Sequence, residues 1–137
     1  MRLFYDGYCF TIDNPKQELV YNPTLVLYFL KHYQRHCRPP RKMLDDNLAM
    51  DHSKLTYISR RANGERLIQR ALQEEKPITI QRLASRFGVA DILATEQKTS
   101  FLTSRLYYCG SLTLNGNDQS GQLIFRIPNL LVRRLYV

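Results

Sequence analysis

The chain has 137 residues, of which 44% are hydrophobic, enough for one domain, or a domain and a half, with an apolar core. Its formal net charge of +8 permits contact with nucleic acid or with an acidic protein surface, but charge bears on association rather than on fold. No apolar run approaches the roughly 18 residues of a membrane span and no signal peptide is visible, so we expect a soluble, cytoplasmic protein.

The N-terminal part is rich in aromatic side chains and then in helical signals. Residues 3–12 hold four aromatics within seven positions, and this density predicts a strand or turn packed against another part of the chain. Asn22 is a good helix N-cap and Pro23 suits the first helical position, so a helix is predicted from about Pro23 to His36. Its first half is apolar nearly all round, which is typical of a helix buried on several sides.

A less regular stretch follows that helix. Arg38–Lys42 predicts a loop, residues 43–52 a loop or a short helical turn, and Ser53 caps a helix that runs to about Arg61. Asn63-Gly64 then interrupts the helical pattern. We therefore divide the chain into a helical segment, residues 1–62, and a second unit, residues 63–137.

The second unit has the element order of a winged helix-turn-helix. Periodicity and turn signals predict a helix at 64–74, a strand at 78–80, a helix at 80–87, a helical turn near 92–93, a helix at 99–109, hairpin strands at 112–114 and 123–127, and a closing helix after Pro128. The hairpin loop is the polar stretch Asn115–Gly121. The expected fold class is α+β, mostly helical, with the β-hairpin as the wing.

Four short motifs appear in order along the chain: Tyr5-Asp6-Gly7-Tyr8-x-Phe10, Val20-Tyr21-Asn22-Pro23, Leu106-Tyr107-Tyr108-x-Gly110-x-Leu112-Thr113 and Ile127-Pro128-Asn129-x-x-Val132-Arg133. Together they resemble the region after the nucleotide-binding core in a family of predicted AAA-type ATPases of bacteria, which often carry a PD-(D/E)XK nuclease-like domain further on. The resemblance covers nearly all of the chain. It implies that residues 1–62 are a lid-like segment and that the chain is a regulatory or protein-interaction module.

The chain departs from that family in features that bear on activity. A Met stands just ahead of the first motif and the chain stops soon after Pro128-Asn129, so we expect a natural truncation, a gene remnant or an excised fragment of a longer ATPase. Ser111 stands where the family usually has Tyr. A phosphate-binding loop needs G-x-x-x-x-G-K-[S/T], and the glycines never give this spacing. We therefore predict no enzymatic activity, no catalytic residue and no cofactor.

The sequence offers one weak pointer to metal chemistry. His32 and His36 are four residues apart on one helix face, with Cys37 next to them, and such a pair is a possible start of a zinc site. A third and a fourth ligand at suitable spacing are missing, so no metal site is predicted. The three cysteines are scattered, which argues for a reducing compartment and excludes a disulfide framework.

The basic charge and the winged-helix order raise a DNA-binding alternative. Residues 79–89 are similar to the first half of a helix-turn-helix, whose next helix would enter the major groove. The candidate groove contacts are Ser100, Thr103, Ser104 and Arg105, and the candidate phosphate contacts are Arg82, Arg86 and Arg126. About nine residues separate Val89 from that helix, where a DNA-reading motif uses a tight turn. A structural or protein-contact role is therefore preferred, with sequence-independent DNA binding as the alternative.

A second apolar side of the helix at 23–36 predicts a partner surface. Val26, Leu27 and Leu30 lie on the side away from Leu25 and Phe29. An ATPase core would cover this side in a full-length relative; here either residues 3–12 fold over it or the chain self-associates. We expect self-association through Val26, Leu27 and Leu30, because an exposed apolar patch of this kind marks a contact surface.

Overall fold

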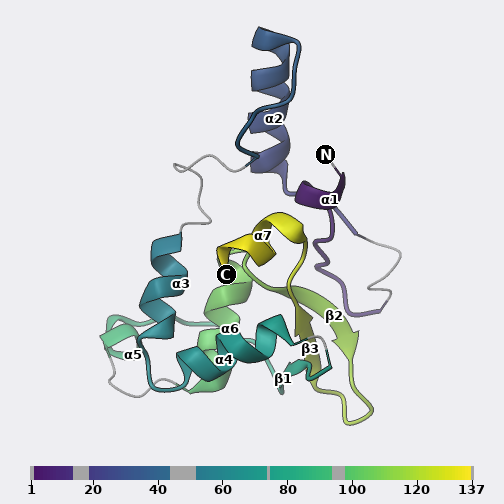
Figure 1. The fold of residues 1–137 in the computed structure, drawn as a ribbon. Helices are drawn as coiled ribbons and strands as arrows, with labels where there is room; N and C mark the ends of the chain where they lie inside the picture. Colours follow the sequence, from purple (N-terminus) through teal and green to yellow (C-terminus); the bar gives the residue numbers. More distant parts are fainter. Residues whose placement is uncertain (1, 14–18, 44–51, 74, 94–97, 137) are drawn as a thin grey trace.

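The computed structural model describes residues 2–13, 19–43, 52–73, 75–93 and 98–136. Helices pack beside a small antiparallel sheet, so the fold is α+β, as predicted (Figure 1). The elements in chain order are α1 (Arg2–Tyr5), α2 (Pro23–His36), α3 (His52–Ser59), α4 (Gly64–Leu72), β1 (Ile78–Ile80), α5 (Val89–Leu93), α6 (Thr99–Tyr108), β2 (Thr113–Asn117), β3 (Leu123–Arg126) and α7 (Leu130–Leu135). The predicted loop or turn at 43–52 falls mostly outside the described residues.

The sheet has the strand order β1-β3-β2 with both pairs antiparallel. Ile78 pairs with Phe125, and Leu114 pairs with Phe125 from the other side. The register of β2 shifts between Leu114 and Asn117, where Gly116 has a φ of 82°. This irregularity lets β2 continue to Asn117, so the connecting turn is shorter than the predicted loop.

The turn between β2 and β3 is organised by one carboxylate. Asp118 Oδ1 accepts hydrogen bonds from the backbone N–H of Ser120 at 2.9 Å, from the Ser120 hydroxyl at 2.8 Å and from the backbone N–H of Gln122 at 2.8 Å. The bond from the Ser120 hydroxyl, followed by those from the backbone, holds the pKa of Asp118 below its ordinary value, because hydrogen bonds to the charged form favour it.

Helix α2 begins and ends where the sequence predicts. The side chain of Asn22 accepts hydrogen bonds from the backbone N–H groups of Thr24 and Leu25, which satisfies donors that the first turn leaves unpaired. The helix ends at His36, and its C-cap Cys37 has a left-handed φ of 51° and an N–H that donates to Tyr33 O. Local capping thus fixes both ends without help from the rest of the fold.

The predicted helix at 80–87 is wrong. Ile80 is the last residue of β1 and pairs with Leu123, and the chain has no regular structure until α5 begins at Val89. The Ala84 N–H donates to Ser104 Oγ at 2.9 Å, and the ring of Phe87 packs on that of Phe101 with centroids 5.1 Å apart. Contacts with α6 therefore replace the helical hydrogen bonds in this segment.

The main core lies between the sheet and helices α3, α4 and α6. Its buried members are Leu55, Ile58, Leu67, Ile78, Ile80, Leu102, Leu106, Leu112, Leu114 and Phe125. Helix α3 comes before the predicted boundary between residues 62 and 63, and α6 comes after it. Both helices contribute buried residues to this one core.

A second core joins the N-terminal segment to the C-terminal helix. Tyr5, Tyr8 and Leu25 are buried against Leu131 and Val132 of α7. The aromatic segment at 3–12 is thus packed, as expected, but it begins with the helical turn α1 and pairs by a single bridge between Tyr8 and Val20. The division into residues 1–62 and 63–137 stays a prediction.

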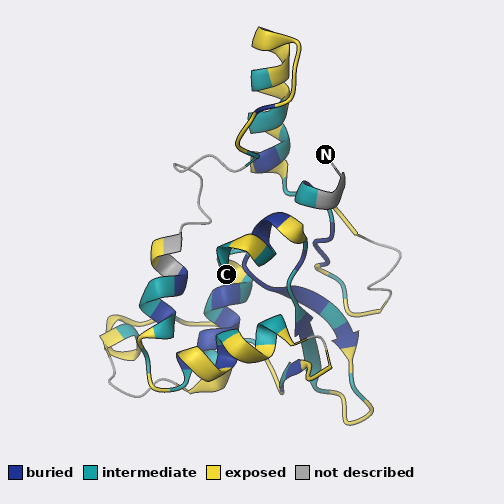
Figure 2. Ribbon diagram, in the orientation of Figure 1, coloured by how far each residue is buried: buried dark blue, intermediate teal, exposed yellow. Residues whose placement is uncertain are grey.

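Helix α2 stands out from the rest of the chain (Figure 1). Only Leu25 of this helix is buried, and its outer half is largely exposed (Figure 2). The expectation that its apolar first half is buried on several sides is therefore wrong. Within the described residues, no helix combines the length and the apolar character that crossing a membrane requires.

Candidate functional site

Helix α6 turns its polar side chains toward the protein interior. Thr103 and Ser104 are fully buried. Ser104 Oγ donates to Ser100 O at 2.7 Å and accepts from the Ala84 N–H at 2.9 Å. Ser100 is exposed and Arg105 is half-buried. Of the four predicted groove contacts, only Ser100 is thus fully presented at the surface, because the other three face neighbouring elements.

Arg105 packs against α3. Its guanidinium lies 4.9 Å from the ring centroid of Tyr57, and the guanidinium of Arg61 lies 4.5 Å from the same ring. Desolvation raises the pKa of Tyr57, but hydrogen bonds and positive charge from Arg61 and Arg105 outweigh it, so the pKa lies below its ordinary value. The arginine predicted to enter a DNA groove is therefore engaged in a cation–π cluster between α3 and α6.

The outward side of α6 is aromatic. Tyr108 is 58% exposed, and its ring meets that of Phe87 edge-on at 5.5 Å. A groove of about 310 Å³ runs beside the end of α6 and the start of α2; its aromatic and proline lining is Tyr8, Phe10, Tyr21, Pro23, Tyr107 and Tyr108. This side of α6 offers aromatic rings and phenol hydroxyls, not the guanidinium and amide groups that make bidentate contacts with base edges.

The predicted phosphate contacts lie on two different elements. Arg82 and Arg86 are exposed on the segment between β1 and α5. Arg126 lies on β3 and donates from Nη2 to Gly7 O at 3.1 Å. It belongs to a basic pocket whose other members lie on α4, on α7 and just before β1.

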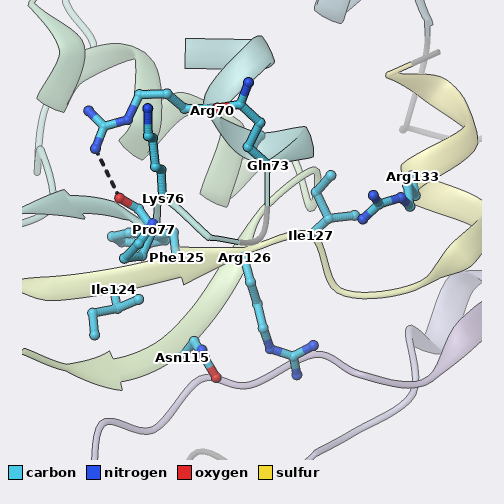
Figure 3. Close-up of a pocket in the computed structure, with 11 residues that line it drawn as sticks. Arg70, Gln73, Lys76, Pro77, Asn115, Ile124, Phe125, Arg126, Ile127 and Arg133 are labelled. Carbon is cyan, nitrogen blue, oxygen red and sulfur yellow. Dashed lines mark hydrogen bonds between the residues drawn. The ribbon is translucent and has the colours of Figure 1, made fainter.

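The basic pocket is a cavity of about 360 Å³ beside the sheet (Figure 3). Its charged and amide side chains are Arg70, Gln73, Lys76, Asn115, Arg126 and Arg133. Four of these are cations, and none of the described residues that line the pocket is acidic. The sequence predicts Arg126 as a phosphate contact but not the other three cations, because no short motif connects positions on α4, before β1 and on α7.

Each arginine of the basic pocket is held by a backbone carbonyl. Arg70 Nη2 donates to Pro77 O at 3.0 Å, and Arg133 Nη2 donates to Leu72 O at 3.2 Å. With the bond from Arg126 to Gly7 O, each of the three lining arginines has a guanidinium N–H held by a backbone carbonyl, and Arg126 extends to the opposite side of the strand from Arg70 (Figure 3). A guanidinium has five N–H donors, so one such bond orients it without exhausting its capacity.

The outer side of α2 is apolar and exposed. Leu27 is 67% exposed and Leu30 is 51% exposed, while Val26 is half-buried beside the second core. Leu30 lies one helical turn after Val26 and Leu27, so the three positions form a continuous surface. Lys31 and Arg35 flank it, and α2 contains no acidic residue.

The two histidines of α2 lie side by side, with ring centroids 4.6 Å apart. The Nδ1 of His32 is 3.2 Å from Arg38 O. Among the described residues, no group of three or more His, Cys, Asp or Glu side chains is placed to hold a metal ion. Cys9, Cys37 and Cys109 are free thiols.

Removal of the two buried hydroxyls of α6, those of Ser104 and Thr103, should affect stability differently. We expect Ser104→Ala to lower the free energy of unfolding by roughly 1–3 kcal/mol, because the Ala84 N–H loses its acceptor. Thr103 Oγ1 is buried without a hydrogen-bond partner among the described residues, so Thr103→Val should be neutral or stabilising. Urea unfolding measures both.

Ser100→Ala is the matched control for these two variants. Ser100 is exposed, and only its backbone carbonyl takes part in the bond with Ser104, so this change should leave stability almost unaltered. A loss for Thr103→Val as large as that for Ser104→Ala would contradict the inward packing of α6.

Comparison with protein-family models, with curated proteins and with solved structures gives no match for this chain.

Proposed function

We propose that this chain is a non-catalytic module of the winged-helix type that acts by contact with protein, in the first place with a second copy of itself. The motif order along the chain supports a relationship to the region that follows the nucleotide-binding core of AAA-type ATPases. In such a setting the module would regulate a neighbouring core or link it to a partner. The alternative is sequence-independent binding of DNA.

The arrangement of elements supports the winged-helix assignment. Helix α4, strand β1, helices α5 and α6 and the hairpin β2–β3 follow one another in the order expected for that architecture. The sheet order β1-β3-β2 places the first strand beside the second strand of the hairpin. The hairpin with its Asp118 turn then takes the place of the wing.

One observation carries the protein-contact function: α2 projects from the body (Figure 1), and its apolar side chains Leu27 and Leu30 are exposed. Full burial of a leucine is worth about 1.5–3 kcal/mol. The single chain does not gain this free energy from the exposed Leu27 and Leu30, and a partner that covers them would. Exposed patches of this kind mark interaction surfaces.

A second copy fits this surface best in an antiparallel arrangement. With two α2 helices crossing between Leu27 and Leu30, the basic last turn of one helix faces the uncharged first turn of the other, at Pro23 and Thr24. The helix dipoles then oppose one another, which is favourable, and a two-fold contact is self-complementary. A 14-residue helix is about 20 Å long, so the contact is small and the dimer weak.

The DNA alternative is supported by the net charge of +8 and by the exposed Arg82 and Arg86. It is opposed by α6, whose polar side chains Thr103 and Ser104 are buried and whose outward side is aromatic. A winged helix that reads a DNA groove through this helix needs polar side chains on the outward side of the helix.

Salt dependence separates the two functions. We expect sedimentation velocity to show a monomer–dimer equilibrium that shifts toward dimer when salt is raised, because salt screens the repulsion between two basic helices while the apolar contact remains. DNA binding would weaken steeply with salt, because phosphate contacts release counterions. A monomer at all concentrations, together with a salt-sensitive mobility shift of duplex DNA, would overturn the proposal in favour of the alternative.

A further inference from the structure

The basic pocket has the charge and donor chemistry of an anion site. Arg70, Lys76, Arg126 and Arg133 line one cavity, and no described residue of its lining carries a negative charge. Like charges gathered around one cavity repel one another, so an anion placed between them relieves an unfavourable interaction. Gln73 and Asn115 add amide donors to the same lining.

Two of the arginines are preorganised for a bidentate ligand. Arg70 is tethered to Pro77 O and Arg126 to Gly7 O by one hydrogen bond each. A guanidinium fixed in this way presents its other N–H groups as a planar fork, which matches phosphate oxygens. Lys76 contributes a mobile point charge of the kind that also binds phosphate.

The shape of the pocket points to more than one phosphate. Figure 3 shows Arg70, Gln73 and Lys76 extending to one side of the strand and Asn115 and Arg126 extending to the other. A volume of about 360 Å³ holds several water molecules, each of which takes about 30 Å³ in the liquid. A single compact anion would reach only part of this lining, whereas linked phosphates would span it.

We propose that the basic pocket binds a chain of linked phosphate groups through Arg70, Lys76, Arg126 and Arg133. The site lies on a different surface from the apolar side of α2, so it goes beyond the proposed protein contact. Linked phosphates come from two sources, a free oligophosphate or the backbone of a nucleic-acid strand, and both present successive anionic groups to the cavity.

Titration calorimetry with inorganic tripolyphosphate tests the site in the intact chain. We expect saturable binding at low salt that weakens when salt rises from about 50 to 200 mM, as phosphate contacts do. Lys76→Gln removes an exposed cation from the lining, and Lys76→Gln with Arg70→Gln should weaken binding by roughly tenfold or more, because each charged hydrogen bond contributes substantially. Lys76→Gln alone should give a smaller loss in the same direction.

Arg60→Gln is the control matched in charge to the single variant Lys76→Gln. Arg60 is exposed after α3 and does not line the pocket, so this variant lowers the net charge by one without touching the site. It should bind tripolyphosphate within about twofold of the wild type, since distant exposed charges are screened. Circular dichroism of each variant verifies that the fold is retained.

A second arm identifies the source of the phosphates. A short oligothymidylate is titrated into the same variants. Binding of both ligands, each weakened by the double variant, supports a site for a nucleic-acid strand; binding of tripolyphosphate alone supports a free oligophosphate. Absence of binding by either ligand at low salt, or an equal loss in Arg60→Gln and in the double variant, overturns the proposal.

Discussion

Gly7→Ala is expected to lower the free energy of unfolding by roughly 2–5 kcal/mol. Gly7 has a φ of 98°, in a region that costs an L side chain about 1–2 kcal/mol. A Cβ at this position would fall on the backbone carbonyl of Pro128, and relieving such a clash costs about 1–3 kcal/mol more. The carbonyl is part of the backbone and cannot simply rotate away, so the N-terminal segment would have to separate from the start of α7.

Gly121→Ala separates the two causes. Gly121 has a φ of 80° in the β2–β3 turn, and a Cβ there meets nothing within 4 Å. It should therefore lose only the roughly 1–2 kcal/mol of the backbone term. Urea unfolding of both variants gives the comparison. Equal losses at the two positions would mean that the close approach of Gly7 to Pro128 is not part of the folded structure.

The sequence predicts those elements whose signals are local. Asn22 and Pro23 define the start of α2, because a cap and a fixed φ act within one turn. The strand at Ile78–Ile80 and the helix from Thr99 are predicted for similar reasons, since apolar periodicity and a flanking Pro or Gly lie within a few residues. The α+β class follows from the order of these elements.

The segment at 81–88 shows where local signals fail. The spacing of Leu83, Ala84 and Phe87 is typical of a helix, yet all three contact residues outside the segment. Leu83 packs against the main core, the Ala84 N–H donates to Ser104 of α6, and the ring of Phe87 packs on that of Phe101 of α6. The same contact explains the inward turn of Ser104, which the DNA-binding alternative places in a groove. A buried serine that accepts a backbone N–H looks the same in sequence as an exposed one.

The basic pocket and the clash at Gly7 are properties of tertiary structure alone. Arg70 and Arg126 meet at one cavity only because β1 pairs with β3, and no spacing in the chain records that pairing. Gly7 belongs to a recognisable motif, but the reason for a glycine there is the carbonyl of Pro128, more than a hundred residues later. The sequence therefore indicates candidate cations but not which of them lie together.

Leu27→Glu should have the largest effect on association. In a two-fold contact through α2, each copy contributes Leu27, so one substitution removes two apolar side chains and brings two carboxylates together. Loss of about 1.5–3 kcal/mol per leucine corresponds to a weakening of roughly a hundredfold or more, at 1.4 kcal/mol for each factor of ten. The folded state should be unaffected, because Leu27 is exposed in the single chain.

Leu93→Glu is the control for this variant. Leu93 lies on α5, is 70% exposed and undergoes the same chemical change at a site away from α2. Both variants lower the net charge by one, so any general effect of charge on association appears in both. A difference in association between Leu27→Glu and Leu93→Glu is therefore specific to α2.

Sedimentation equilibrium of the wild type, Leu27→Glu and Leu93→Glu across the micromolar range tests protein contact through α2 most directly. Self-association through α2 predicts a mass that rises with concentration toward that of a dimer for the wild type and for Leu93→Glu, and a monomer at every concentration for Leu27→Glu. A wild type that remains strictly monomeric, or a dimer that Leu27→Glu leaves intact, would contradict it.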